Sequence, residues 1–231
     1  MRDIKRRKSS IQSTQQITKA MKLVSTVKLQ KAKVHAEQAN PYFNYMYRTV
    51  TSMLAKTGNL NHPYLNKNDS DKKAVIVITS NRGLAGGYNA NVVKMITGAG
   101  YQRGEIGEIY LAYTHFKNTV VHEPKLMKLL PVEFDDLEIP DEDESNVLMN
   151  YEPNEEDALD MIIPKYVTSL FYGAFVEAVA SENGARMQAM DSATSNAEDM
   201  ISDLTLKYNR ARQGSITQEL TEIIAGAEAI S

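Results

Sequence analysis

The sequence predicts an α/β protein in which two long terminal helices form an antiparallel coiled coil and flank a compact middle domain. The first 40 residues contain neither glycine nor proline, and residues 165–231 contain no proline, whereas the glycines cluster in the middle. Because both residue types interrupt helices, the two ends can form long helices. A β-branched apolar run lies between them. We predict a first helix over 1–56, an α/β domain with an acidic connector over 57–158 and a last helix over 159–231.

The N-terminal segment shows the periodicity of an amphipathic helix. Its apolar residues recur at steps of three and one and predict a single stripe: Ile17, Ala20, Met21, Val24 and Val27. Lysines occupy the remaining faces. We expect the helix to continue to about Ala55 and to bend at Pro41, because proline removes a backbone donor. Gly58 is typical of a helix end.

The middle of the chain has an α/β pattern. Residues 74–79 (AVIVIT) are continuously apolar, as in a strand buried on both faces. A glycine-bearing turn at 80–88 and a helix at 89–97 follow. A second strand is predicted at 108–114 (EIYLAYT), and the intervening segment is long enough for a crossover between parallel strands. We expect a further strand at 119–123.

The C-terminal segment predicts a second long helix. Its apolar residues keep a helical rhythm from Leu159 to Val179. Alanines then recur every four residues from Ala185 to Ala197, a spacing that lets another helix approach closely. With Pro164 in its first turn the helix would span 67 residues, or roughly 100 Å at about 1.5 Å per residue. A helix of this length needs a partner, and we expect the N-terminal helix to supply it.

Charge is distributed unevenly. Residues 1–35 hold ten Lys or Arg and one acid, whereas residues 133–160 hold thirteen Asp or Glu and no Lys or Arg. This asymmetry indicates partners of different charge at different places. The basic face could bind nucleic acid, an acidic lipid surface or an acidic protein, or could simply be solvated. No aromatic residue that could stack on bases precedes Tyr42.

The sequence offers no positive sign of an active site. The chain has no cysteine, which excludes disulfides, thiolate zinc sites, iron–sulfur clusters and cysteine nucleophiles. Its four histidines lack metal-ligand spacing. The turn at 82–89 (RGLAGGYN) matches neither phosphate-binding glycine motif. We expect no cofactor. Two alternatives remain: a coiled-coil adaptor that binds nucleic acid, and a nucleotide-using enzyme built on residues 74–123.

Several segments together resemble one family. Residues 16–25 (QITKAMKLVS), 80–89 (SNRGLAGGYN), 208–213 (YNRARQ) and 216–227 (ITQELTEIIAGA) resemble, in this order, the gamma subunit of the rotary F-type ATP synthase in its bacterial form. The resemblance implies that the middle domain is Rossmann-like. It also implies a non-catalytic central-stalk rotor that couples rotation of the c ring to conformational change in a catalytic hexamer.

The resemblance implies partners and contact residues as well. The partners would be three alpha and three beta subunits, the epsilon subunit and the membrane ring of c subunits, with no nucleic acid. The chain would lie peripherally at the cytoplasmic face of the bacterial plasma membrane, associated with it indirectly, in a proton-driven synthase. The expected partner-contact residues are Lys19, Met21, Lys22, Lys28, Arg212, Gln213, Ile216, Thr217 and Glu219.

The sequence departs from the family in the middle domain. The resemblance implies at least one further strand and helix near residues 98–107, where this sequence has only ten residues, four of them glycine. Either the chain is a shortened variant or a segment is missing from the sequence as written. The lack of cysteine also excludes the thiol control of the plastid form, and the start at Met1-Arg2-Asp3 fits a bacterial form.

Overall fold

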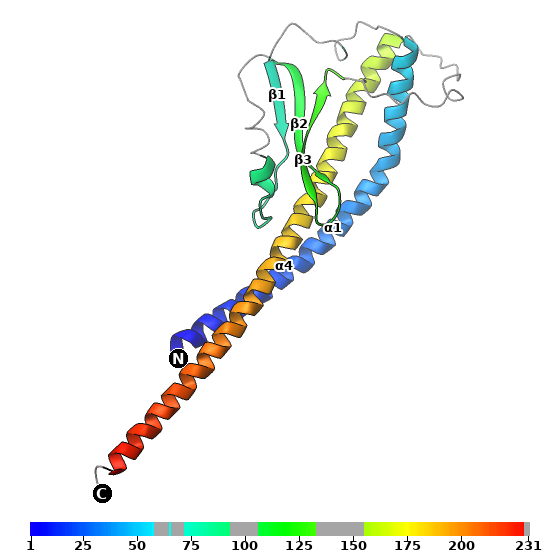
Figure 1. Cartoon of the computed structure of the whole chain (residues 1–231). Coiled ribbons are helices and arrows are strands. Elements are labelled where there is room, and N and C mark those ends of the chain that lie inside the picture. The colour runs from blue at the N-terminus through cyan, green and yellow to red at the C-terminus, as the bar shows by residue number, and fades with distance from the viewer. Residues whose placement is uncertain (58–64, 66–71, 93–105, 133–154, 229–231) are drawn as a thin grey trace. The chain divides into compact units, whose positions relative to one another are not determined.

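The computed structural model describes residues 1–57, 65, 72–92, 106–132 and 155–228. Its elements are α1 (Arg2–Thr57), β1 (Lys72–Val77), β2 (Ile106–Phe116), β3 (His122–Leu130) and α4 (Glu155–Glu228), shown in Figure 1. Two long terminal helices and a small sheet confirm the predicted fold class. The predicted helix at 89–97 begins as a helical turn over 88–92, and its remainder, like the acidic connector up to 154, lies outside the described residues.

The chain divides into two compact units. We call Met1–Ser25 with Arg186–Ser231 the helix-pair unit, and Thr26–Ala185 the sheet unit. Both α1 and α4 contribute to both units, so this division follows other lines than the predicted boundaries 1–56, 57–158 and 159–231. Those boundaries stay a prediction. Each unit is described by itself below.

In the helix-pair unit the two helices run antiparallel. The Lys22 ammonium lies 2.6 Å from Asp191, and the Gln15 amide donates to Glu198 over 2.9 Å. An earlier residue of α1 therefore pairs with a later residue of α4. Since the two ends of the chain pair in this way, the predicted antiparallel coiled coil is confirmed.

The seam of this pair has a heptad period, with small or polar side chains at its centre and larger apolar ones towards its ends. Buried and half-buried positions alternate at steps of four and three, the pattern of a left-handed coiled coil. In α1 they are Ile11, Gln15, Thr18, Lys22 and Ser25, and in α4 they are Met190, Thr194, Ala197, Ile201, Leu204, Tyr208, Ala211 and Ser215. The Thr18 and Thr194 hydroxyls lie 2.7 Å apart in the buried centre. The centre of the seam, at Thr18, Ser25, Thr194 and Ala197, thus relies on close approach of the two helices.

The predicted apolar stripe of α1 was therefore placed on the wrong face. Ile17 is 59% exposed and Val24 is 56% exposed. The helix pair instead buries the neighbouring positions Thr18 and Ser25, whose small side chains let the two backbones come close. The larger apolar side chains are left on the outside.

Among the residues that the structure describes, the sheet unit holds three strands in the order β1-β2-β3. β1 and β2 are parallel, which confirms the predicted crossover, and β2 and β3 are antiparallel. The third strand begins near the expected place and extends to Leu130. Among the described strands β1 borders only β2, and Ile76 and Val77 are 40% and 42% exposed. The expectation that residues 74–79 are buried on both faces is therefore wrong.

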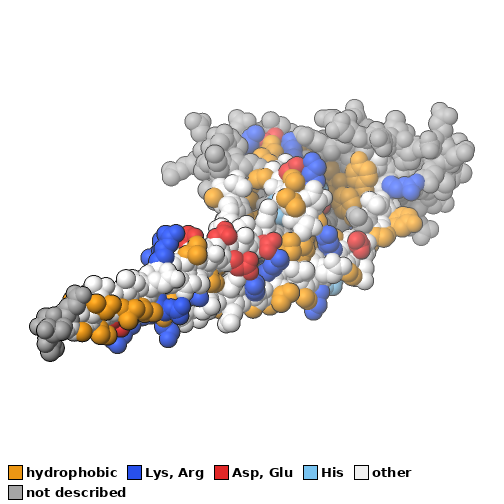
Figure 2. Space-filling view, turned by 60° about the horizontal axis from the view of Figure 1, so that its bottom comes forward, with side chains coloured by type: hydrophobic (Ala, Val, Ile, Leu, Met, Phe, Trp, Pro, Cys, Tyr) orange, Lys and Arg blue, Asp and Glu red, His pale blue; other side chains and the backbone are white. Residues whose placement is uncertain are grey.

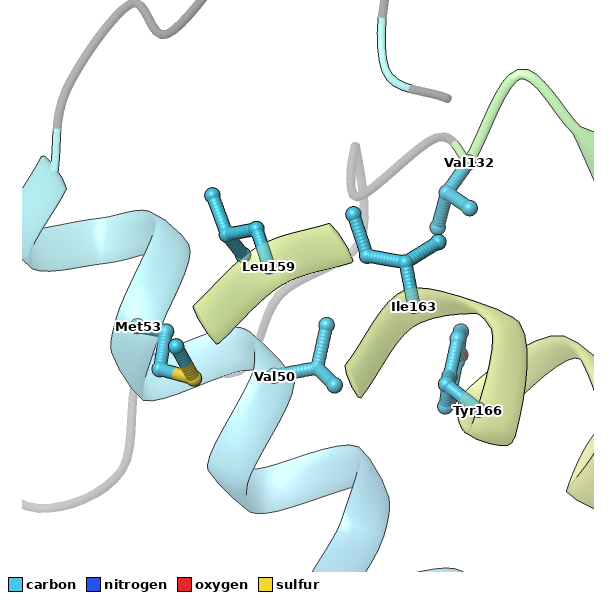
Figure 3. Close-up of a cluster of buried hydrophobic side chains, with 6 residues drawn as sticks. All are labelled: Val50, Met53, Val132, Leu159, Ile163 and Tyr166. Atoms are coloured by element: carbon cyan, nitrogen blue, oxygen red, sulfur yellow. The ribbon is translucent and has the colours of Figure 1, made fainter. Parts of the chain in front are cut away.

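α4 covers one face of the sheet, as Figure 1 shows. Its Ala174 packs with Leu111 and Tyr113 of β2 and Leu129 of β3. A second cluster joins α4 to α1 through the buried residues in Figure 3: Val50, Met53, Val132, Leu159, Ile163 and Tyr166. The helical rhythm predicted from Leu159 onwards is thus confirmed for its inner positions.

The prolines in both helices lie inside them. α1 continues through Pro41 to Thr57, and α4 begins at Glu155, nine residues before Pro164. The expectation that Pro164 sits in the first turn is wrong, and α4 has 74 residues instead of 67. Leu159 and Ile163 explain the extension, because each is buried against α1 and stabilises the helical turns before and around the proline.

One glycine of α4 is required by a close approach. A Cβ atom at Gly184 would lie 2.6 Å from Cε1 and 3.1 Å from Nε2 of His122, at the start of β3. Both ring nitrogens of His122 are buried without a hydrogen-bond partner, and burial lowers the pKa of this imidazole. A neutral histidine therefore packs directly against the α4 backbone.

We expect Gly184→Ala to destabilise the chain by about 1–3 kcal/mol, because the imidazole must move out of a packed position. Urea unfolding followed by circular dichroism measures this. The control is Gly173→Ala, whose Cβ would meet nothing within 4 Å. It should stabilise the helix by up to about 1 kcal/mol. Adding His122→Ala to Gly184→Ala should remove most of the penalty, and equal effects of the two glycine substitutions would contradict the contact.

A single carboxylate links all three strands. Glu108 of β2 lies 2.8 Å from Lys73 of β1 and 3.2 Å from Lys128 of β3, and the Tyr110 hydroxyl donates to it over 2.9 Å. The Glu108 side chain is only 10% exposed. Hydrogen bonds from Lys73 and Tyr110, with a further contribution from Lys128, lower the pKa of Glu108 to about 2.

This pKa shift predicts an acid-sensitive sheet. The unfolded chain takes up the Glu108 proton near the ordinary pKa of 4.5, and the folded chain only near 2. The stabilisation is present above about pH 4.5 and is lost as pH falls towards 2. In Glu108→Gln the melting temperature should be lower at about pH 7 and should fall less between about pH 5 and pH 3. Glu123→Gln, in a half-exposed pair with Lys117, is the control and should keep the wild-type slope. Identical slopes for all three proteins would refute the role of Glu108.

Candidate functional site

The predicted contact residues of α1 are engaged within the chain. Lys19 lies 3.0 Å from Glu198, with both side chains 55% exposed, and Lys22 lies 2.6 Å from Asp191. Met21 is half-buried beside them. The resemblance implied that these residues contact a partner. The structure shows basic side chains that are already neutralised by α4, in pairs that are open to solvent.

The predicted contact residues of α4 lie farther along the helix-pair unit. Arg212, Gln213, Thr217 and Glu219 are exposed, and Ile216 is 49% exposed. Fourteen residues separate Arg212 from Glu198, which corresponds to about 21 Å of helix. The predicted residues thus form two groups on the helix-pair unit.

Lys28, the remaining predicted contact residue, is exposed on α1 but belongs to the sheet unit. It joins neither of the two groups.

The helix-pair unit carries a set of exposed apolar residues, of which the sequence predicted those at the C-terminal end of α4 and missed those on α1. They are more than half exposed on α1 and on the last turns of α4: Ile17, Leu23, Val24, Leu220, Ile223 and Ile224. In Figure 2 apolar side chains along the C-terminal part of α4 alternate with Lys and Arg. Exposed apolar residues that lie together mark an interaction surface, and Leu220, Ile223 and Ile224 are neighbours on α4 by their spacing. The signal was present in the sequence, but the stripe was interpreted as the coiled-coil seam.

The glycine turn after β1 packs against α4. The Ser80 N–H donates to Asn89 Oδ1 over 2.9 Å, the Asn81 N–H faces Glu182 Oε2 at 3.4 Å, and the Tyr88 hydroxyl donates to the Ala178 carbonyl over 3.1 Å. Gly86, at φ 60°, takes the left-handed conformation that the turn needs. The Glu182 carboxylate faces the Asn81 amide and would repel a phosphate. The turn therefore suits packing against α4 and disfavours a bound phosphate.

Neither a metal site nor a membrane span is found in the part of the chain that the structure describes. Within it no three His, Asp or Glu side chains gather as metal ligands would. None of its helices contains a stretch long and apolar enough to cross a bilayer.

Comparison with known proteins identifies the family. The family model described as ATP synthase matches residues 1–100 and 97–230. The chain is 57% identical to the ATP synthase gamma chain of Lachnoclostridium phytofermentans over 288 aligned positions, covering 100% of this chain and 99% of that relative. The chain belongs to the ATP synthase gamma chain family. It is therefore a subunit of an enzyme complex, and the resemblance seen in the sequence is confirmed.

Other gamma chains and solved structures agree. The gamma chain of Acetobacterium woodii, named sodium ion specific, is 36% identical, with 100% of this chain and 99% of that one covered. A chain in the Euglena gracilis mitochondrial ATP synthase structure titled OSCP/F1/c-ring matches with a TM-score of 0.68 and 17% identity, over 99% of this chain and 94% of that chain. This second likeness concerns the fold.

This gamma chain is shorter than its relatives in the middle domain. The alignment with the L. phytofermentans gamma chain has 288 positions and this chain has 231 residues, so at least 57 positions are gaps in this chain. The two parts of the family match meet at residues 97–100. Both findings agree with the shortfall expected near residues 98–107.

The ion pairs of α1 should be energetically weak. We expect Lys19→Ala to lower the stability of the isolated chain by no more than about 1 kcal/mol, since both partners are half exposed. The melting temperature should change by no more than about 2–4 °C. Arg7→Ala, at an exposed position on the same helix, is the matched control. A much larger loss for Lys19→Ala than for Arg7→Ala would mean that the Glu198 pair is structural and that Lys19 is not available to a partner.

Proposed function

We propose that this chain is the central-stalk rotor subunit of its ATP synthase and couples rotation of a membrane c ring to conformational change in a hexamer of three alpha and three beta subunits. The observation that carries the proposal is the helix-pair unit, an antiparallel coiled coil with its larger apolar residues on the outside. The gamma-chain relatives support the same role, and a similar fold occurs in a solved chain titled as rotor.

A shaft must touch several equivalent surfaces in turn without locking onto one. Ile17, Leu23 and Val24 offer apolar contact, but they lie beside charged side chains that remain hydrated. Contacts of this mixed kind are weaker than a continuous apolar interface and can be remade at each step. The two groups of predicted residues, around Lys19 and around Arg212, would meet different levels of the hexamer.

The proposed role is non-catalytic. In the glycine turn of the sheet unit the Asn81 amide faces Glu182 of α4 and the Ser80 amide is taken up by Asn89, which disfavours a phosphate there, so a nucleotide site would belong to the alpha and beta subunits. The epsilon subunit and the c ring complete the proposed set of partners. Through them the chain would be held indirectly at the cytoplasmic face of the bacterial plasma membrane.

The proton is the proposed coupling ion. A relative that is 36% identical is named sodium ion specific, so the two ions define a direct test. In membrane vesicles that contain the whole complex, ATP synthesis should follow an imposed proton gradient and persist without sodium. If synthesis depends on sodium, sodium is the coupling ion instead of the proton, and the proposed rotor role is unaffected.

We predict that Arg212→Ala lowers ATP hydrolysis and proton-coupled synthesis by the complex about tenfold or more, with the helix content of the chain unchanged. The guanidinium can pair with a carboxylate through two hydrogen bonds, and this loss is worth about 1.5–3 kcal/mol where water is excluded. Gln213→Ala should act in the same direction with a smaller effect. Alpha and beta subunits of the L. phytofermentans synthase suit the hydrolysis assay, since its gamma chain is 57% identical, and synthesis is measured in membrane vesicles that contain the whole complex.

Lys207→Ala serves as the control for these two variants, because it removes an exposed cation from the same helix outside the predicted groups. It should leave hydrolysis and synthesis unchanged. Wild-type activity in both Arg212→Ala and Gln213→Ala would remove these residues from the contact surface. If the wild-type chain fails to join the hexamer at all, the rotor proposal itself is wrong.

A further inference from the structure

The sheet unit contains a cavity that no step of the rotor role uses. Its volume is about 910 Å³, and it lies between α1, α4 and the sheet. Residues 35–43 of α1 and 164–177 of α4 supply most of its lining, with Tyr113 of β2 and Lys125 and Met127 of β3. Cavities that hold small ligands usually measure about 300–1,000 Å³. This one is therefore large enough for a molecule of that kind.

The walls of the cavity are apolar and aromatic. Tyr113 is 4% exposed and lies in the interior, whereas Tyr42 and Tyr172 are half exposed. Phe43 and Met127 complete these walls. Aromatic faces and a thioether favour a flat or flexible apolar molecule.

The charged groups around the cavity are biased towards the positive. Lys125 and Lys165 are exposed and form no ion pair with any residue that the structure describes. The lining carboxylate, Glu177, is hydrogen-bonded to His115 Nδ1 at 2.6 Å. His35, on α1, is the remaining ionisable group of the lining besides Tyr side chains. Two ammonium groups are thus available to a negatively charged ligand.

We propose that this cavity binds a small amphiphilic anion, with its apolar body between the aromatic walls and its carboxylate or sulfonate at Lys125 and Lys165. A cationic amphiphile would be repelled by both lysines. The lining hydroxyls of Thr168 and Ser169 already donate to carbonyls of α4, so the two lysines are the main charged donors, whereas the several phosphates of a nucleotide would need more. A long-chain carboxylate satisfies both the apolar interior and the basic rim.

Gly173 gives the proposal a precise test. It lines the cavity, and a Cβ added to it would meet no atom within 4 Å. The Cβ of Gly173→Leu therefore has open space, its longer side chain should fill part of the cavity, and leucine favours the helix more than glycine does. The variant is expected to fold at least as well as the wild type and to lose ligand space. Gly214→Leu is the matched control, because Gly214 is a helical glycine of α4 with equally open surroundings in the helix-pair unit.

The experiment uses the full chain and two dyes with the same aromatic body. 1-Anilinonaphthalene-8-sulfonate carries a sulfonate, and N-phenyl-1-naphthylamine is neutral. We expect one saturable site for each dye, at which the monomeric long-chain carboxylate laurate competes. Gly173→Leu should weaken both dyes by at least about tenfold, since the bound dye would overpack the cavity. Lys125→Ala and Lys165→Ala should each weaken the sulfonate by about threefold, the value of an exposed ion pair, and leave the neutral dye unchanged.

Other outcomes would overturn the proposal. If the wild type and Gly173→Leu bind the dyes equally well, the dyes bind the exposed apolar residues of the helix-pair unit and not the cavity. Weaker dye binding by Gly214→Leu would lead to the same conclusion. Equal losses of both dyes in the lysine variants would contradict anion selectivity. Vesicles that contain phosphatidylglycerol distinguish a bilayer from a free acid. If they bind the chain and Gly173→Leu has no effect on that binding or on laurate, the lysines serve a lipid surface and the cavity site is wrong.

Discussion

The close pairing of the two chain ends is the constraint on which the rest of the helix-pair unit depends. Thr18 and Thr194 meet in the middle of the seam, and Ser25 and Ala197 occupy further buried positions. Small side chains let two helices approach, but they bury little apolar surface each. Stability must then come from the length of the seam, because each heptad adds a small increment. The same choice leaves larger apolar residues such as Ile17 outside, where a partner can use them.

The sheet unit meets a different constraint, which is the small size of its described sheet. At least 57 alignment positions filled in a close relative are absent from this chain. β1 is as apolar as a central strand, yet it borders only β2 among the described strands. Glu108 of β2 offsets the small size of the sheet in part, because its carboxylate pairs with Lys73 of β1 and with Lys128 of β3. The packing of α4 stabilises the sheet further, since Gly184 lets the α4 backbone pack against His122 of β3.

The sequence was sufficient for elements whose signal is local and repeated. Both long helices, the parallel pair β1 and β2 and the family followed from periodicity and motif order. The α1 side of the seam did not, because a face of Thr and Ser carries a weaker hydrophobic signal than the stripe of Ile17 and Val24 beside it. The prediction that the helix starts at Pro164 is wrong for a related reason. The burial of Leu159 against α1 outweighs the local tendency of proline to break a helix. The cavity depends on elements far apart in the sequence, and no local pattern indicates it.

The internal ion pairs bear on how a shaft can turn smoothly, given the proposed rotor role. A free lysine would gain energy when it meets an acidic partner and lose it on leaving, so it would favour a few angular positions. Lys19 and Lys22 already hold Glu198 and Asp191, and an incoming carboxylate would exchange one exposed pair for another. An exposed ion pair stabilises by about 0.2–1 kcal/mol, so exchanging an internal pair for a pair with the partner changes the free energy by less than this amount. Neutralisation within the helix pair thus flattens the rotational energy profile while it keeps the surface hydrated.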